Sequence, residues 1–341
     1  MNEIKWERYP HLSGQEQACT WLTIQAHLGL AANTLAAYAR ALDEYLGFCA
    51  RREIDALKAK REHIALYVNR LADRKCANHT QKGLSNATMQ QRLTAVRLYY
   101  DYLVEESLRE RNPVGRGHYV PGRAFALSSQ RGLLPQYRRL PWIPSADEWR
   151  AILEAARTEP LRNRFMLALS YDSALRREEL CSLQTSDLDP AHRLVHIRAE
   201  TTKTHQARVV PYSPVTGELL AGYLSERRAL SRQRGRLLLS TSPRNKGQPI
   251  TIWTWSKVVR QLALRADVPQ FSTHTPRHLC LTDLARANWD LHEIAQFAGH
   301  RSTQTTLLYI HLSGRELADK LAQGMESIQM WRLHMLENLL P

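Results

Sequence analysis

Phe271-Ser-Thr-His-Thr-Pro-Arg-His278 and Phe297-Ala-Gly-His-Arg-Ser-Thr-Gln-Thr-Thr-Leu-Leu-Tyr309 are two short stretches near the C-terminus that contain histidine, arginine and tyrosine side chains close together in sequence. In the first stretch, His274 and Arg277 stand three residues apart, so on a helix they share one face. Pro276 fits the first turn of that helix, where its missing N–H costs nothing. The first stretch therefore predicts the start of a helix that presents an imidazole beside a guanidinium.

The same stretches contain the residues that begin and end helices. Ser272 or Thr273 is the expected cap of the helix that follows them. Gly299 is placed to end an amphipathic helix, because glycine adopts the left-handed conformation that terminates helices. Ser302 or Thr303 can then cap a further helix that carries Tyr309. The chemistry-bearing residues are thus expected at the ends of short helices.

Composition indicates a nucleic-acid partner. The chain has 341 residues, a formal net charge of +14 and a pI near 9.8. Its length predicts two domains, each with its own core. The basic excess is rich in arginine and spread along the chain, which favours a polyanion such as nucleic acid. No apolar run is long enough for a membrane span, so we expect no membrane partner.

The cysteines favour a reducing compartment. There are five, scattered, with no C-x-x-C pair. We therefore predict no disulfide framework and no zinc site, and we expect the protein in the cytoplasm, acting on the nucleoid. No phosphate-binding loop of the G-x-x-x-x-G-K-[ST] type is present, so ATP is not expected to take part. No cofactor and no metal are predicted.

The N-terminal part predicts a small helical domain. Residues 1–14 read as a loose leader without a signal peptide. Apolar residues then recur at helical spacing in three segments, at 33–49, at 63–74 and after Ser85-Asn86. We predict that residues 15–112 form this all-helical domain.

A basic linker follows. Residues 113–143 contain glycines, prolines and arginines, and a structureless stretch of this length is uncommon inside a compact domain. We predict a connector between domains that lies along phosphates. The alternative is a linker that is merely solvated.

A second domain is predicted over residues 144–314. Ser145 and Glu148 have the spacing of a capping box. Helices are expected at 146–157, 161–173, 177–183, 214–231 and 253–266, and two strands at 194–198 and 207–212. Residues 201–205 form the tip of the predicted hairpin between these strands. Residues 315–341 read as a helical tail.

The candidate site residues suit phosphoryl transfer to a protein hydroxyl. Arg277 can hold the oxygens of a phosphate through its planar fork of donors. A tyrosine hydroxyl such as that of Tyr309 has a free pKa of about 10 and needs an electropositive pocket to attack at neutral pH. His274 and His300 can move protons or donate hydrogen bonds to the phosphate. Cations and imidazoles together make a metal unnecessary.

Several motifs, in order along the chain, resemble those of the tyrosine recombinases, the lambda-integrase family. They are Ala174-Leu-Arg-Arg-Glu-Glu-Leu180, Thr202-Lys-Thr-His-Gln-Ala-Arg-Val-Val-Pro211, His274-Thr-Pro-Arg277, Gly299-His300 with Tyr309, and the helix at 33–49. The resemblance covers roughly residues 15–325. It implies a mainly α fold with a small β-sheet in the catalytic domain. A SAM-like helical core-binding domain and that catalytic domain would form a C-shaped clamp on DNA.

The resemblance also implies a mechanism. Tyr309 attacks the scissile phosphate, which leaves a 3′-phosphotyrosyl link and a free 5′ hydroxyl. Arg176 and Arg277 hold the non-bridging oxygens. Because the covalent link conserves the energy of the broken bond, neither ATP nor a metal is needed.

Three further residues receive roles in the same way. Lys203 is the general acid for the leaving 5′ oxygen, His274 assists proton transfer, and His300 donates a hydrogen bond to the phosphate. Each residue also has an ordinary explanation by itself, such as a solvated lysine or a surface histidine. The ordered set of motifs favours the catalytic interpretation.

The chain departs from the family pattern at four positions. Ala174 replaces a glycine, a mild change if that position is helical. Pro276 stands where leucine is usual, which a first turn tolerates. Thr204 and His205 replace a usual Gly-Asn in the hairpin, while the distance from Lys203 to Arg208 and Pro211 fits the family pattern.

The resemblance implies partners as well. We expect double-stranded DNA with an inverted-repeat core site, a homotetramer on synapsed DNA, and a monomer or weak dimer when free. The tail would pass to a neighbouring protomer, or else fold back on its own domain. A simple-site enzyme of a mobile element or of the Xer type is favoured, while phage integrase, transposon recombinase and dimer resolvase all stay open.

Two other functions remain as alternatives. A type IB topoisomerase shares the tyrosine chemistry but relaxes supercoils as a monomer without site specificity. A catalytically inactive DNA-binding regulator would keep the basic charge but would not need the complete set of site residues.

Overall fold

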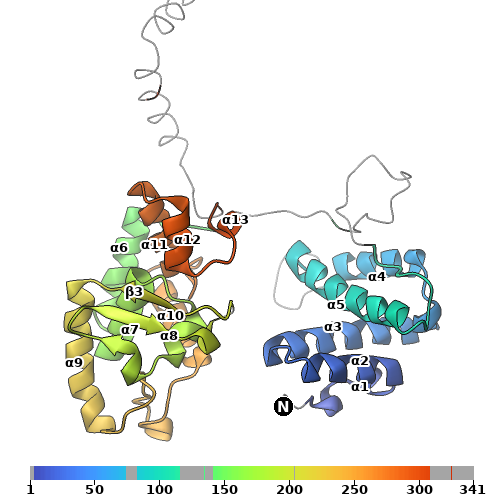
Figure 1. The fold of residues 1–341 in the computed structure, drawn as a ribbon, viewed down its shortest axis with the longest axis horizontal. Helices are drawn as coiled ribbons and strands as arrows, with labels where there is room; N and C mark the ends of the chain where they lie inside the picture. The colour runs from blue at the N-terminus through green and yellow to red at the C-terminus, as the bar shows by residue number, and fades with distance from the viewer. Residues whose placement is uncertain are drawn as a thin grey trace, which may run out of the picture. The chain divides into compact units, whose positions relative to one another are not determined.

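A computed structural model describes residues 4–73, 83–115, 134, 141–202, 204–307 and 324. The chain divides into two compact units, Met1–Arg139 and Leu140–Pro341, drawn in blue to teal and in green to red in Figure 1. Helices dominate both units, and one small sheet lies in the second. This confirms the predicted fold class of two mainly α domains with a little β structure.

The first unit is a helical bundle. Its elements are η1 (Trp6–Arg8), α1 (Pro10–Ser13), α2 (Glu16–His27), α3 (Ala32–Arg51), η2 (Ala56–Lys58), α4 (Arg61–Asp73) and α5 (Asn86–Glu105). The long helices α3 and α5 pack on each other through buried aromatic rings. At the centre the Tyr45 hydroxyl lies 2.7 Å from that of Tyr100, which in turn donates to Ala56 O at 2.8 Å. These bonds satisfy two buried hydroxyls in an otherwise apolar core.

The predicted loose leader is wrong for residues 4–14. They form η1 and α1, and Tyr9 and Leu12 are buried in the core of the first unit. The carboxylate of Asp43 accepts from the N–H groups of His11 and Leu12, which satisfies two donors at the start of α1. The segment is too short for its periodicity to show at the level of sequence, and packing against α3 determines its structure.

The predicted linker lies largely outside the described residues. At its start, Val114 is buried against the first unit. Leu134 is buried there too, and its carbonyl accepts from the Gln90 side chain at 3.1 Å. Val114 and Leu134 therefore pack on the helical bundle, whereas Trp142, near the end of the predicted linker, packs against the core of the second unit.

In the second unit, helices surround a three-stranded sheet. The helices are α6 (Ala146–Ala156), α7 (Leu161–Asp172), α8 (Arg177–Ser182), α9 (Pro214–Leu230), α10 (Ile252–Arg265), α11 (Thr275–Arg286), α12 (Leu291–Ala298) and α13 (Thr303–Thr306), with η3 (Thr185–Asp187), η4 (Ala199–Thr201) and η5 (Pro243–Asn245) between them. The helices predicted in this domain are confirmed to within two residues. The capping box of Ser145 and Glu148 is confirmed as well.

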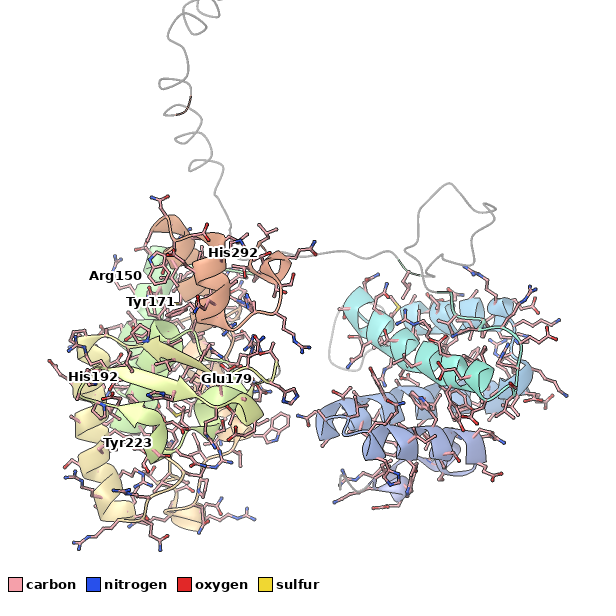
Figure 2. All side chains as sticks on the ribbon, in the orientation of Figure 1. Arg150, Tyr171, Glu179, His192, Tyr223 and His292 are labelled. Atoms are coloured by element: carbon pink, nitrogen blue, oxygen red, sulfur yellow. The ribbon has the colours of Figure 1, made fainter. Side chains whose placement is uncertain are left out.

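The sheet is antiparallel in the order β1 (Leu188–Asp189), β2 (Leu194–Ile197) and β3 (Arg208–Pro211). Val195 pairs with Val210 in the register, and both side chains are buried. The hairpin of β2 and β3 is confirmed. The strand β1 was not predicted, because two residues are too few to show an alternation of apolar and polar side chains. In Figure 2, Arg150, His192 and His292 lie on the exterior of this unit, whereas Glu179 is inside it.

Candidate active site

Arg176 stands at the start of α8, where the chain turns into the helix. Its backbone N–H donates to Glu179 Oε2 at 2.9 Å, and its Nη1 donates to Oε1 at 2.7 Å. The Arg-x-x-Glu spacing thus acts as a cap, in which the N3 carboxylate reaches back to the residue before the helix. Arg176 Nη2 also donates to Gly299 O at 3.3 Å. One fifth of the side chain is exposed.

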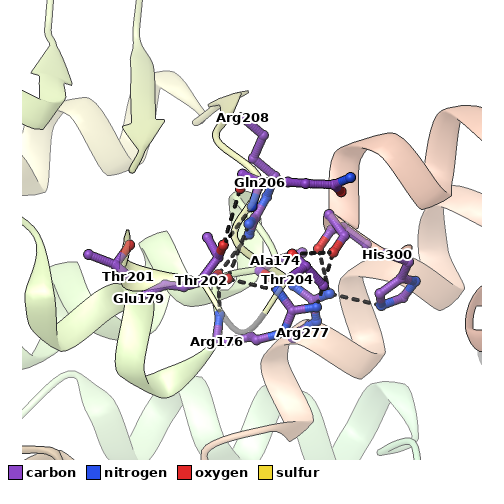
Figure 3. A network of polar contacts seen from close by, with 12 residues as sticks. Ala174, Arg176, Glu179, Thr201, Thr202, Thr204, Gln206, Arg208, Arg277 and His300 are labelled. Carbon is purple, nitrogen blue, oxygen red and sulfur yellow. Dashed lines mark hydrogen bonds and ion pairs between the residues drawn. The ribbon is translucent and has the colours of Figure 1, made fainter. Parts of the chain in front are cut away.

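Arg208 holds the same carboxylate from the sheet. Its Nη1 and Nη2 donate to the two oxygens of Glu179 at 3.1 and 2.7 Å (Figure 3). Burial alone would raise the pKa of Glu179, but the hydrogen bonds and charges of Arg208 and Arg176 hold it at about 2. The carboxylate is therefore ionised at neutral pH. Two guanidiniums against one carboxylate leave a net positive charge.

Arg277 connects three segments. It is 3 % exposed and lies in the first turn of α11, which Pro276 also occupies, as predicted. Its Nη1 donates to Ala174 O, and its Nη2 donates to Ala298 O at 2.7 Å. The same Nη2 lies 2.9 Å from His300 Nε2. Arg277 thereby joins the segment before α8 to the end of α12.

His300 follows the glycine that ends α12. Gly299 has φ 63°, which confirms the predicted helix end. Because arginine has no acceptor, His300 Nε2 must accept from Arg277, so Nδ1 carries the proton and donates to Thr306 Oγ1 at 2.9 Å. Burial and the charges of Arg277, Arg176 and Arg208 lower the pKa of His300 to about 3. The imidazole is neutral at physiological pH.

His274 lies at the N-cap of α11 and is open to solvent. Contacts that partly desolvate the ring lower its pKa, as do the charges of Arg177, Arg277 and Arg176, while Glu178 acts in the opposite sense. The expected cap at Ser272 or Thr273 is wrong. Instead the Thr275 hydroxyl accepts from the Ser272 N–H at 2.9 Å, because the chain enters α11 in a tighter turn.

Lys203 and Tyr309 lie outside the described residues. Next to the first, Thr204 Oγ1 donates to Gly299 O at 3.5 Å, a long bond that brings the hairpin tip to the Gly299–His300 turn. Before the second, Ser302 caps α13 by accepting from the Gln304 N–H, as predicted. The structure therefore brings Arg176, Arg277 and His300 together through hydrogen bonds.

Two features were missed at the level of sequence. Ala174 has φ 45° and is fully buried, so the position is left-handed rather than helical and the loss of glycine there is not mild. Arg208 was used only to place the hairpin, although an arginine two residues before the buried Val210 points to the same inner face of the strand. A cation on that face signals a buried anion, which is Glu179.

No cluster of three or more potential metal ligands occurs within the described parts of the chain. Over the same residues, no helix is long and apolar enough to cross a membrane.

The chain resembles known proteins over most of its length. The sequence profile described as the phage integrase family matches residues 144–316, which is 173 of the 341 residues, and the profile of the phage integrase N-terminal SAM-like domain matches residues 21–107. The tyrosine recombinase XerC of Azotobacter vinelandii is 30 % identical over 289 residues, covering 84 % of this chain and 87 % of the relative. The tyrosine recombinase XerD of Oceanobacillus iheyensis is 28 % identical over 296 residues, covering 85 % and 91 %.

Solved structures show the same fold. The XerH site-specific recombinase bound to a palindromic difH substrate matches with a TM-score of 0.68 and 18 % identity, covering 91 % of this chain and 84 % of that one. The Tn1549 transposon integrase in complex with transposon right end DNA matches with a TM-score of 0.66 and 15 % identity, covering 89 % and 98 %. With the profile over half of its length and the curated relatives, the chain belongs to the phage integrase family and is a tyrosine recombinase.

Proposed function

We propose that this recombinase cleaves one DNA strand with Tyr309 as the nucleophile. The tyrosine oxygen forms a bond to the scissile phosphorus, and the bond from phosphorus to the 5′ oxygen breaks. Lys203 protonates that oxygen, which leaves a 3′-phosphotyrosyl link and a free 5′ hydroxyl. Attack by a 5′ hydroxyl of another strand reverses the steps and rejoins the DNA.

The observation that supports this proposal is the convergence of Arg176, Arg277 and His300 on the Gly299 turn. The phosphate in attack gains charge on its non-bridging oxygens, and the two guanidiniums can each supply a fork of donors to them. His300 Nε2 accepts a hydrogen bond from Arg277. A phosphate that binds Arg277 would release this nitrogen, which could then carry a proton and donate it in a hydrogen bond to the phosphate. His274, at the mouth of the network, assists the proton transfers.

The proposed partner is duplex DNA with an inverted-repeat core site, which the helical domain, the linker and the catalytic domain would enclose as a C-shaped clamp. Two similar structures are described as XerH on a palindromic site and as a lambda integrase dimer on a core site. Because recombination of two duplexes needs four active sites, we propose that four protomers assemble on two synapsed duplexes, with residues 315–341 exchanged between neighbours, and that the free protein is a monomer or weak dimer. A mobile-element or Xer-type role in the cytoplasm fits these partners.

The test is a suicide substrate, which is nicked DNA that carries a cognate site and, after cleavage, loses the short fragment that bears the free 5′ hydroxyl. Candidate sites come from the DNA that flanks the gene. Wild type, Tyr309→Phe and the control Tyr102→Phe are incubated without metal or ATP. We expect an adduct that resists SDS and is destroyed by protease for wild type and control, and none for Tyr309→Phe.

The other outcomes separate the alternatives. An adduct in Tyr309→Phe would mean that another residue attacks. Tight site binding with no adduct from any protein would favour the inactive regulator. Relaxation of plasmids that lack the site would favour a topoisomerase.

A further inference from the structure

One long stretch of the catalytic unit carries positive charge without any acid. Between Glu226 and Asp267 the sequence has ten arginines and lysines and no aspartate or glutamate. Half of them fall in residues 227–236, at the end of α9 and in the loop after it. Like charges at this density repel one another unless an anion is bound. Such a segment is therefore expected to bind a partner of opposite charge.

A buried arginine gives this loop a defined shape. Arg227 is 6 % exposed, and its guanidinium donates to the carbonyls of Leu237, Ser231, Gln233 and Arg236 at 2.8–3.3 Å. The Tyr223 hydroxyl on the same helix, labelled in Figure 2, donates to Leu237 O at 2.9 Å as well. The loop backbone is thus fixed from inside the protein.

This loop borders a hollow of about 950 Å³ that is open to solvent. Its polar lining includes the side chains of Thr185, Ser186, Arg228, Ser231, Arg232 and Arg234. The three arginines are exposed. In the described part of the chain none of these three guanidiniums pairs with a carboxylate. By contrast, Arg150, Arg157 and Arg286 on the same unit each pair with an acid three residues earlier.

The lining indicates which anion fits. Guanidiniums and hydroxyls bind phosphate oxygens, and the hollow is much larger than a single phosphate. The apolar part of the lining is limited to Leu224, Ala229 and the stems of the arginines, with no aromatic ring on which an unpaired base could stack. These features suit the sugar-phosphate backbone of a duplex.

The hollow is separate from the catalytic network. Among the hydrogen bonds between described residues, those of Arg176, Arg277 and His300 involve no residue that lines the hollow. In Figure 1, α9 lies along the edge of the unit away from α12 and α13. The scissile phosphate and a backbone bound in the hollow are therefore different phosphates.

We propose that Thr185, Ser186, Arg228, Arg232 and Arg234 form a second DNA-backbone site, which holds duplex DNA without reading its sequence. This proposal depends on the proposed function in one respect, namely that DNA is the polyanion on which the enzyme acts.

The test compares two triple variants of the full chain that lose the same charge. Arg228→Gln/Arg232→Gln/Arg234→Gln removes the arginines of the hollow, and Arg150→Gln/Arg157→Gln/Arg286→Gln removes the carboxylate-paired arginines. Affinity for a long duplex without a recombination site is measured over a range of salt. Each lost phosphate contact makes the slope of log K against log salt less steep by about 0.9, so we expect a change of about 2 to 3 for the first variant and less than about 1 for the second.

A slope for the hollow variant that equals the wild-type slope, or that of the paired-arginine variant, would overturn the proposal. So would unchanged DNA binding with loss of an acidic protein partner. At saturating protein, the hollow variant should form the Tyr309 adduct at the wild-type rate. If wild type forms no adduct, the proposed function is wrong, but the salt slopes still show whether the hollow binds the DNA backbone.

Discussion

Arg208 and Glu179 form a two-point ion pair between strand β3 and helix α8, with Nη–Oε distances of 3.1 and 2.7 Å. Both side chains are nearly inaccessible, at 6 % and 0 % exposure. Arg208 Nε also donates to Phe297 O at 3.0 Å, which satisfies a carbonyl at the C-terminal end of α12. The pair therefore links the segment that carries Arg176 to the turn that carries His300.

Arg208→Met should destabilise the protein and slow cleavage. Removing one partner of a buried ion pair costs roughly 3 kcal/mol, and here it leaves Glu179 with Arg176 as its remaining partner. Arg176 would lose the carboxylate geometry that orients it, so we expect adduct formation to slow about a hundredfold, a typical loss for a misaligned electrostatic donor. Urea unfolding and single-turnover cleavage measure the two effects.

The control for that variant is Arg157→Met, which breaks an exposed pair with Glu154. It should change stability by less than about 1 kcal/mol and leave cleavage unchanged. Cleavage by Arg208→Met at the wild-type rate would show that the ion pair does not orient Arg176.

Stability should fall as the pH drops below about 6.5, the ordinary pKa of histidine. His300 has a pKa of about 3 in the folded protein, so between these values the unfolded chain binds a proton that the folded chain does not. The unfolding free energy therefore rises with pH in this window and is lost on acidification. Glu179, with a pKa of about 2, adds a second loss below about 4.5.

The measurement is the unfolding free energy from pH 7 to pH 5 for wild type and His300→Gln. Glutamine does not titrate, so the variant should show a shallower pH dependence. Equal slopes for the two proteins would mean that His300 keeps an ordinary pKa in the folded state.

His205→Gly should stabilise the hairpin. His205 is exposed and has φ 54°, a conformation that costs a non-glycine residue about 1–2 kcal/mol. Glycine removes this cost but gives the unfolded chain more freedom, worth about 0.4–1 kcal/mol. We expect a net gain of about 0.5 kcal/mol by chemical denaturation.

Ala174→Gly is the matched comparison, because Ala174 also has a positive φ of 45°. Its methyl group is fully buried, and losing that group costs about 0.8 kcal/mol. The relief of strain should nearly cancel against the sum of the lost burial and the added freedom of the unfolded chain. A larger gain at position 174 than at position 205 would contradict this accounting.

Sequence reasoning predicted most helices because their apolar residues recur at helical spacing and their caps are local. It predicted the hairpin from alternation and Gly299 from its place after α12. It did not predict α1, whose order comes from Asp43 and the α3 surface, far along the chain. The partner of Arg208 was missed for the same reason, since an ion pair between β3 and α8 has no local signature.

Gly299→Ala should disturb the network without removing any of its charged groups. The residue has φ 63°, and a Cβ atom there would lie 3.0 Å from Arg208 Nη1. The strained backbone alone costs about 1–2 kcal/mol. The new methyl group would also press on Arg208, and the Gly299 carbonyl that accepts from Arg176 would move with the turn. We expect cleavage to slow more than DNA binding weakens, because the positions of Arg176 and His300 matter most in the transition state.

The control is Gly14→Ala, where a Cβ atom meets no neighbour and φ is not positive. Single-turnover cleavage and DNA affinity should be unchanged in that control, and equal losses of both in Gly299→Ala would indicate general disruption instead.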